Sequence, residues 1–283
     1  MLIGLSASIL FSAFPTQAFS ISPLKYVVTV ASGENQDLVV SVKNDSDEKK
    51  EFVASVMGVG QDLAGRPIFK KNIDVAENWI KAKESEVTLA INESADFVFT
   101  IKVPKNTPPG AHYLGLSIEQ KSDQSVSNKL ATILTLQVAG TANESLRLGY
   151  FGFENKYFFN KNWEGLLLLK NIGNIDLNLT GQIILFGIDD QVIFSRGVNL
   201  GNEVFSQSVR QIKIDFSDNS SLVLPGKYKA QIKINYGLLD QQLIGEASFW
   251  YLPVWFLVAF LLLVVLLFVL VIVKFRKKKN VEL

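Results

Sequence analysis

The sequence predicts an all-β protein in which two tandem β-sandwiches are followed by one transmembrane α-helix. Two observations carry this prediction. Apolar and polar residues alternate along many short segments, and one uninterrupted apolar run lies close to the C-terminus. Alternation with a period of two is typical of strands that bury one face, whereas an apolar run of about 20 residues is long enough to cross a membrane.

Alternating segments fill the region from residue 19 to residue 250. Apolar side chains occupy every second position of 97–103 and of 228–234, and most of the intervening residues are polar. Turn-forming Pro-Gly pairs at 109–110 and 225–226 separate such segments, and no segment in this region has a helical period. About seven strands are expected in each half, which is the number found in an immunoglobulin-like sandwich.

The domain boundary is predicted in a small, polar stretch, AGTANESL at 139–146. It divides a first immunoglobulin-like sandwich at 19–142 from a second at 143–250. Both halves contain Lys-Asn followed by a turn, at 43–44 and at 170–171, and later a strand, a Pro-Gly turn and another strand. The two sandwiches are therefore predicted to resemble each other, through duplication or through the pattern that all such sandwiches share.

Residues 252–273 are predicted to form the transmembrane helix, because 254–273 contain no polar residue. At about 1.5 Å per residue, a helix of 20 residues spans roughly 30 Å, the thickness of the hydrocarbon core of a bilayer. Five Lys or Arg residues and one Glu make 274–283 a basic tail. The positive-inside rule places this tail in the cytoplasm and the sandwiches outside, in a single-pass protein of the plasma membrane.

Both ends of the predicted exported region have features that are typical of a membrane-anchored, secreted chain. Trp250, Tyr251 and Trp255 are predicted to lie in the outer aromatic belt of the membrane. Residues 1–18 are apolar and then small, as in a secretory signal peptide, but they lack the usual positive charge. Either the true start lies upstream or the signal is atypical. The mature chain is expected to begin near Phe19.

The composition excludes several kinds of chemistry. Lys and Arg number 28 against 27 Asp and Glu, so the balanced charge does not favour nucleic-acid binding. There is no cysteine and only one histidine, which excludes a zinc site of the usual ligands and limits a hydrolase triad to His112. No Gly-rich phosphate loop is present. We predict a non-enzymatic protein without a cofactor, although carboxylates distant in sequence leave an acid–base mechanism open.

His112 begins an alternating strand in the stretch PGAHYLGLSI at 109–118. When its Pro-Gly turn is aligned with that of PGKYKAQIKI at 225–234, His112 falls on Tyr228. An aromatic ring at such a position packs against the core, and its polar edge reaches a backbone group. The alignment therefore predicts a structural role for His112 rather than a chemical one.

A long, Gly-containing segment at 58–80 is predicted to be a loop inserted in the first sandwich. Loops longer than about 15 residues in a compact domain are often functional. Tryptophans such as Trp79, and Trp163 in the second sandwich, either pack in a core or anchor a partner. The candidate partner-contact residues are Arg66, Ile68, Phe69 and Trp79.

The first sandwich resembles a known family in FSISPLKYVVTVASGENQDLVVSVKNDSDE at 19–48, in ENWI at 77–80, in VTLAINESADFVFTIKVPKNTPPGAHYLGL at 87–116 and in ATILTLQVAG at 131–140. The second sandwich contributes LLLLKNIGNIDLNLTGQI at 166–183. These stretches, with the order of signal, two sandwiches, membrane helix and basic tail, resemble the WxL-interacting proteins of Gram-positive bacteria. The resemblance implies a cell-surface protein whose first domain associates with peptidoglycan and whose second associates with surface proteins that carry WxL domains.

We therefore expect a membrane-anchored cell-surface protein that binds or tethers an exported surface protein or the peptidoglycan cell wall. Lipid would be contacted through 252–273. The alternative is an accessory subunit of a membrane or secretion complex, in which the helix itself is the contact surface. Replacing 254–273 by an unrelated apolar helix would abolish function only under the alternative.

Overall fold

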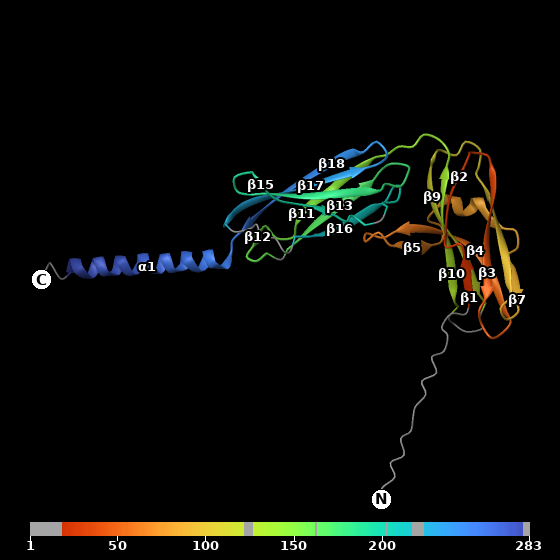
Figure 1. The fold of residues 1–283 in the computed structure, drawn as a ribbon, viewed down its shortest axis with the longest axis horizontal. Coiled ribbons are helices and arrows are strands. Elements are labelled where there is room, and N and C mark those ends of the chain that lie inside the picture. Colours follow the sequence, from red (N-terminus) through yellow and green to blue (C-terminus); the bar gives the residue numbers. More distant parts are fainter. Residues whose placement is uncertain (1–18, 122–126, 162, 202, 217–223, 280–283) are drawn as a thin grey trace, which may run out of the picture. The chain divides into compact units, whose positions relative to one another are not determined.

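The computed structural model describes residues 19–121, 127–161, 163–201, 203–216 and 224–279 (Figure 1). The signal peptide expected at 1–18 and the last four residues of the expected tail lie outside these ranges. The described residues divide into two compact units. Unit 1 extends to Gly60 and continues with Phe69–Thr141, and unit 2 comprises Gln61–Ile68 and the chain from Ala142 onwards.

Unit 1 is a sandwich of two sheets. One sheet has the strand order β1-β3-β8-β6, and the other has the order β2-β10-β9-β4-β5, with β7 paired to β4. The elements are β1 (Phe19–Ser22), β2 (Lys25–Val30), β3 (Asn35–Asn44), β4 (Lys50–Gln61), β5 (Pro67–Lys70), the 3-10 helix η1 (Val75–Trp79), β6 (Ile80–Ala82), β7 (Glu86–Leu89), β8 (Ser94–Lys102), β9 (Gly110–Gln120) and β10 (Lys129–Val138).

Unit 2 is a second sandwich followed by the only α-helix among the described residues. Its sheets have the orders β11-β13-β16 and β12-β18-β17-β14-β15. The elements are β11 (Leu146–Phe153), β12 (Tyr157–Phe158), β13 (Glu164–Asn171), β14 (Leu179–Phe186), β15 (Val192–Val198), β16 (Val209–Asp215), β17 (Gly226–Tyr236), β18 (Gln241–Tyr251) and α1 (Val254–Lys279).

The two sandwiches correspond strand for strand. The order β1-β3-β8 in unit 1 matches β11-β13-β16 in unit 2, and β2-β10-β9-β4-β5 matches β12-β18-β17-β14-β15. In both units the first strand of the larger sheet is parallel to its neighbour, whereas the other described pairs are antiparallel. The predicted fold class is confirmed, because the chain forms two tandem immunoglobulin-like sandwiches and one C-terminal helix.

The structure corrects three details of the sequence-based expectation. The described residues contain ten strands in unit 1 and eight in unit 2, because short edge strands such as β5 and β6 are too brief to show alternation. Residues 58–80 are not a loop but the end of β4, a hairpin to β5, and η1. Gln61–Ile68, expected in the first sandwich, belongs to unit 2, where the carbonyl of Leu63 accepts a hydrogen bond from the backbone N–H of Gln211 at 2.7 Å.

The core of unit 1 follows from the alternation in its sequence. Every second residue of β8 is buried, and Phe97, Phe99 and Ile101 are at most 1% exposed. Leu116 of β9 and Leu134 of β10 face them from the other sheet and are fully buried. Burying a side chain of this kind stabilises the fold by roughly 1.5–3 kcal/mol, so the core alone explains how a sandwich without disulfides stays folded.

The Lys-Asn motif of unit 1 places a buried amide at the end of β3. The side-chain Nδ2 of Asn44 donates to the carbonyls of Glu48, Leu89 and Ala90 at 2.8–3.1 Å, and its Oδ1 accepts from the backbone N–H and hydroxyl of Ser46. Asn44 is fully buried. Its amide therefore joins the turn after β3 to the end of β7 and satisfies carbonyls in both segments.

Asn171 has the same role in unit 2. It is fully buried at the end of β13, its Nδ2 donates to the carbonyls of Ile175 and Val204, and its Oδ1 accepts from the backbone N–H of Gly173. The two Lys-Asn motifs that are similar in sequence thus occupy corresponding places in the two sandwiches.

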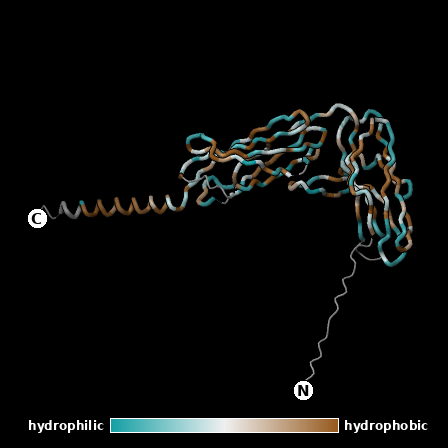
Figure 2. Tube along the Cα trace, in the orientation of Figure 1, coloured by the Kyte–Doolittle hydropathy of each residue, from teal (hydrophilic) through white to brown (hydrophobic). Residues whose placement is uncertain are grey.

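The C-terminal helix α1 has the length and composition of a membrane span over Val254–Lys274, and it is apolar on all sides (Figure 2). The helix continues to Lys279, so the first basic residues of the predicted tail are helical. Trp250 and Trp255 are exposed, as expected for an aromatic belt. The prediction for Tyr251 is wrong, because its ring is 5% exposed and packs edge-on against Tyr228 in the core of unit 2.

Candidate functional site

The segment 69–79 packs against β4 and β9 of unit 1, with Ala76 of η1 fully buried in the core, and two glycines make room for it. A Cβ atom at Gly115 of β9 would lie 2.8 Å from Cε1 of Phe69, and a Cβ atom at Gly58 of β4 would collide with Ile73. A larger residue at either position would push the segment away. The first candidate surface is therefore held against these strands and is not a free loop.

The start of η1 is held by a capping box. Asp74 is the N-cap residue, and its Oδ1 accepts a hydrogen bond from the backbone N–H of Ala76 at 2.9 Å. Glu77 reaches back and accepts from the backbone N–H groups of Asp74, Ile73 and Asn72 at 2.9–3.1 Å. These bonds satisfy donors that a helix start would otherwise leave unpaired.

His112 of β9 fastens the same cap to the sandwich. Its Nδ1 lies 2.8 Å from Oδ1 of Asp74, and its ring meets that of Trp79 edge-on with 4.7 Å between the ring centroids. The His112 side chain is 19% exposed. The predicted packing role is confirmed. The predicted partner is wrong, because the polar edge of the ring meets a carboxylate from the inserted segment and not a backbone group.

The carboxyl group of Asp74 is ionised over a wide pH range. Burial by itself raises its pKa, but hydrogen bonds from His112 and from the backbone N–H groups of Ala76 and Tyr113, with the charge of His112, outweigh this effect. The pKa of Asp74 is therefore held below its ordinary value of 3.8. The cap, the histidine and the tryptophan form one cluster that depends on a negative charge at Asp74.

The four predicted contact residues do not form one site. Arg66 is exposed and forms an ion pair with Asp62 at 2.8 Å, and it lies with Ile68 in the segment that belongs to unit 2. Phe69 belongs to unit 1, and both Ile68 and Phe69 are exposed by more than 40%. Trp79 packs against the core of unit 1, so most of its ring has a structural function.

One edge of Trp79 also lines a groove of about 750 Å³ on the smaller sheet of unit 1. The groove contains three lysines and one aspartate, and it is lined by Asn35, Asp37, Asn78, Trp79, Lys81, Ala82, Lys83, Thr100, Lys102 and Pro104. Lys83 forms an ion pair with Asp37 at 2.6 Å, and hydrogen bonds from Lys83 and Thr100 hold the pKa of Asp37 below its ordinary value. Lys81 and Lys102 are exposed. We call this surface the basic groove.

Sequence reasoning missed the basic groove because its lysines come from two strands. Lys81 and Lys83 follow Trp79 directly, but Lys102 lies on β8, which pairs with β6. Outward-facing lysines on strands are common, so no single segment of the sequence indicates a groove. The groove is indicated only by the pairing of β6 with β8, which brings Lys81 and Lys102 together beside Trp79.

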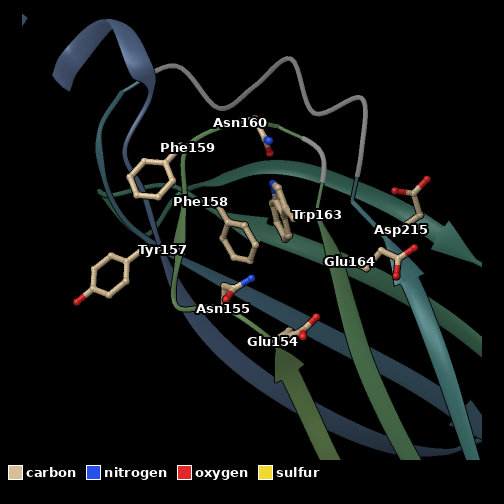
Figure 3. Close-up of a pocket in the computed structure, with 9 residues that line it drawn as sticks. All are labelled: Glu154, Asn155, Tyr157, Phe158, Phe159, Asn160, Trp163, Glu164 and Asp215. Atoms are coloured by element: carbon tan, nitrogen blue, oxygen red, sulfur yellow. The ribbon is translucent and has the colours of Figure 1, made fainter. Parts of the chain in front are cut away.

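Unit 2 has a different hollow, of about 710 Å³, near the start of α1 (Figure 3). Its walls combine aromatic rings with three carboxylates, and it is lined by Glu154, Asn155, Tyr157, Phe158, Phe159, Asn160, Trp163, Glu164 and Asp215. We call this surface the acidic pocket. Trp163 forms its inner wall and is 5% exposed, with its ring stacked on Phe216 at a centroid distance of 4.4 Å. This confirms Trp163 as a packing tryptophan.

The aromatic residues around the acidic pocket point in two directions. Phe158 points toward Trp163, whereas Tyr157 and Phe159 point away from it (Figure 3). Tyr157 and Phe159 are 55% and 49% exposed. The inward rings belong to the core of unit 2, and the outward rings are available to another surface.

The described residues contain no cluster of side chains that could hold a metal ion. Among them, no three His, Asp or Glu side chains converge in a way that could hold one. His112 is engaged by Asp74 and Trp79 and lines neither hollow. The basic groove combines lysines with the edge of a tryptophan, and the acidic pocket combines carboxylates with aromatic rings.

The comparisons with known proteins concern the fold. The chain matches no family model and no curated protein. It is similar to the class 5 fimbriae chaperone CfaA, with 15% identity over 83% of this chain and 100% of that chain and a TM-score of 0.44. It is also similar to the CsuC–CsuE chaperone–tip adhesion subunit complex of Acinetobacter baumannii, with 16% identity over 72% of this chain and 94% of that chain and a TM-score of 0.39. The E. coli chaperone DraB is 12% identical over 82% of this chain and 96% of that chain, with a TM-score of 0.38. Similarities of this size carry no ligand or partner over to this chain.

Proposed function

We propose that this chain is a non-enzymatic, membrane-anchored surface protein that binds or tethers an exported protein or the cell wall. The observation that carries the proposal is the join between sandwich and span. Strand β18 ends at Tyr251, α1 begins at Val254, and only Leu252 and Pro253 lie between them. A sandwich joined so closely to a span stays at the membrane surface, where an exported partner can be held.

The basic groove supports a binding function for unit 1. Its lysines attract partners that carry carboxylates or phosphates, and a partly exposed tryptophan edge adds apolar contact area. The Lys83–Asp37 pair fixes one lysine in place, while Lys81 and Lys102 are exposed for contact. An anionic polymer or an acidic protein segment fits this chemistry.

The resemblance to the WxL-interacting proteins names candidates for the two units. It implies that unit 1 associates with peptidoglycan, which carries carboxylates, and that unit 2 associates with an exported protein that has a WxL domain. We assign the basic groove to the first association. The acidic pocket, with Glu154 and Asp215, is the matching candidate surface on unit 2.

The proposal is tested with the full chain held in lipid nanodiscs as bait. Purified cell wall and the exported proteins of the source organism are passed over it, and empty nanodiscs serve as the background. We expect capture of one or both above background, and a severalfold loss for cell wall in the variant that combines Lys81→Glu with Lys102→Glu. The matched control is Lys170→Glu, which alters an exposed strand lysine outside both hollows. Capture no better than background for every fraction would contradict the proposal.

The proposed orientation has its own test, because the chain contains no cysteine. Leu238→Cys, at a position 92% exposed in unit 2, should react with a membrane-impermeant maleimide on intact cells. Val281→Cys in the tail should react only after the cells are opened. The reverse pattern would place the sandwiches in the cytoplasm and would exclude an exported partner.

A further inference from the structure

Four large apolar side chains are exposed at the end of unit 2 from which α1 leaves. They are Tyr157, Phe159, Ile188 and Trp250, with exposed fractions of 55%, 49%, 53% and 43%. We call them the collar. β12 lies at this end of the sandwich, next to the start of the helix (Figure 1). A cluster of exposed apolar residues on a folded domain marks an interaction surface.

Backbone pairing fixes two members of the collar beside the last strand. Tyr157 is the register partner of Trp250 in the parallel pair β12–β18. The backbone N–H of Leu252 donates to the carbonyl of Phe158 at 2.8 Å, one residue before Phe159. Side chains that lie more than 90 residues apart in the sequence are therefore held together at the point where the chain enters the helix.

Ile188 reaches the same end from the turn between β14 and β15. A Cβ atom at Gly226 would collide with Ile188, and Gly226 is the register partner of Tyr251. Ile188 therefore lies beside Gly226, on the strand that pairs with the end of β18. Three separate segments of unit 2 contribute to the collar.

The join to α1 limits how far the collar can be from the membrane. Two residues separate Tyr251 from Val254, and an extended chain advances at most about 3.6 Å per residue. The headgroup layer on each side of a bilayer is roughly 5–8 Å thick, from a total of about 40–45 Å around a core of about 30 Å. Residues bonded to Leu252 consequently lie within reach of the headgroups when α1 spans the membrane.

The chemistry of the collar also matches this layer. Trp and Tyr concentrate at membrane interfaces because their rings are apolar and their edges are polar. Lys156 and Lys227 are exposed beside it, and anionic headgroups attract such lysines. The carboxylates of the acidic pocket lie on the other side of Phe158, away from Tyr157 and Phe159 (Figure 3).

We propose that the collar inserts into the headgroup layer of the outer leaflet and seats unit 2 on the lipid surface. The contact would limit the movement of the sandwich about the short join at Leu252–Pro253. This inference rests on the proposed membrane anchor, but it assigns a lipid-binding role to residues of the sandwich itself.

Single-cysteine labelling of the full chain tests the proposal. Tyr157→Cys, Phe159→Cys and Ile188→Cys are each labelled with a fluorophore in nanodiscs of phosphatidylglycerol and phosphatidylcholine that carry a nitroxide on the headgroup. Leu238→Cys, on the exposed turn between β17 and β18, is the matched control. Val264→Cys in α1 is read with a nitroxide on the acyl chain and reports whether the span is inserted.

We expect severalfold stronger headgroup quenching at the three collar positions than at Leu238→Cys. Collar quenching equal to that of Leu238→Cys, with an inserted Val264→Cys label, would overturn the collar and leave the anchor intact. An unquenched Val264→Cys label would overturn the anchor and the collar together. Collar labels that are quenched by headgroups no more than Leu238→Cys, but that an added exported protein shields from a soluble quencher, would show that the collar binds protein and would overturn the lipid assignment.

Discussion

The two sandwiches share one strand topology, but they differ at one aromatic position near the start of the corresponding strands β9 and β17. In unit 2, Tyr228 of β17 stacks on Phe249, and its hydroxyl donates to the carbonyl of Leu224 at 2.7 Å. In unit 1, the equivalent His112 packs on Trp79 and meets the carboxylate of Asp74. The side chain at this position packs in the core of unit 2, whereas in unit 1 it holds the segment that contains Asp74 and Trp79.

This difference shows how a sandwich acquires a new surface without a change in its strand topology. The segment 69–79 of unit 1 is held by contacts at Gly58 and Gly115 and by His112 at its cap, and it ends at the tryptophan that borders the basic groove. Unit 2 lacks an equivalent helix among its described residues, and three of its exposed aromatic residues, Tyr157, Phe159 and Trp250, lie instead at the end from which α1 leaves. The predictions below test this contrast, from the largest expected effect to the smallest.

The largest expected difference is in the loss of stability when Trp163 or Trp79 is replaced by alanine. Trp163→Ala removes a ring that is 5% exposed and packed against Phe216 and Phe249, so it should lower the free energy of unfolding of unit 2 by about 3–5 kcal/mol. Trp79→Ala in unit 1 should cost less, because its ring also borders the groove. Denaturant unfolding of the full chain in detergent, with hydrogen exchange to assign each unit, measures both. Equal losses would contradict the contrast.

The two buried asparagines should behave alike, since they belong to the shared frame. Asn44→Ala and Asn171→Ala each leave buried carbonyls without a donor, which should cost about 1–3 kcal/mol in either unit. Asn178→Ala, at an exposed position, is the control and should change stability by less than about 0.5 kcal/mol. A large loss in one unit and none in the other would show that the correspondence is superficial.

The hydroxyl of Tyr228 should matter less than either asparagine. Tyr228→Phe keeps the stacked ring but removes the bond to Leu224, so unit 2 should lose about 0.5–1.5 kcal/mol of unfolding free energy. His112→Phe should preserve the packing on Trp79 but free the cap at Asp74, so hydrogen exchange should rise in η1. Unchanged exchange in η1 would mean that the cap holds without His112.

The smallest expected effect is the pH dependence that Asp74 contributes to the stability of unit 1. The pKa of Asp74 in the folded chain lies below its ordinary value of 3.8, so its contribution to stability is complete above that value and is lost as the pH falls through the folded pKa. Asp74→Asn should therefore lower stability at neutral pH and flatten the acid dependence of unit 1. Asp189→Asn, in an exposed turn of unit 2, is the control. Parallel acid profiles for wild type and Asp74→Asn would contradict this role.

Local sequence patterns predict the core strands of this protein, whereas its candidate binding surfaces arise from the pairing of strands that are distant in sequence. Alternation at 97–103 and 228–234 gives the core strands, and the aligned Pro-Gly turns correctly place His112 beside the core. The partner of His112 is not predictable, because Asp74 caps a five-residue helix that is too short to show a period. Lys102 and Phe159 become site residues only through β6–β8 pairing and the Leu252–Phe158 hydrogen bond, which no local pattern records.

The central claim is that the sandwiches, and not the span, hold an exported partner. Cross-linking at the surface of intact cells, followed by identification of what is attached, tests it most directly. The account predicts an exported protein or cell-wall fragment, recovered in equal yield from the wild-type chain and from a chain whose residues 254–273 are replaced by an unrelated apolar helix. Cross-links only to membrane proteins, lost when the helix is replaced, would contradict it.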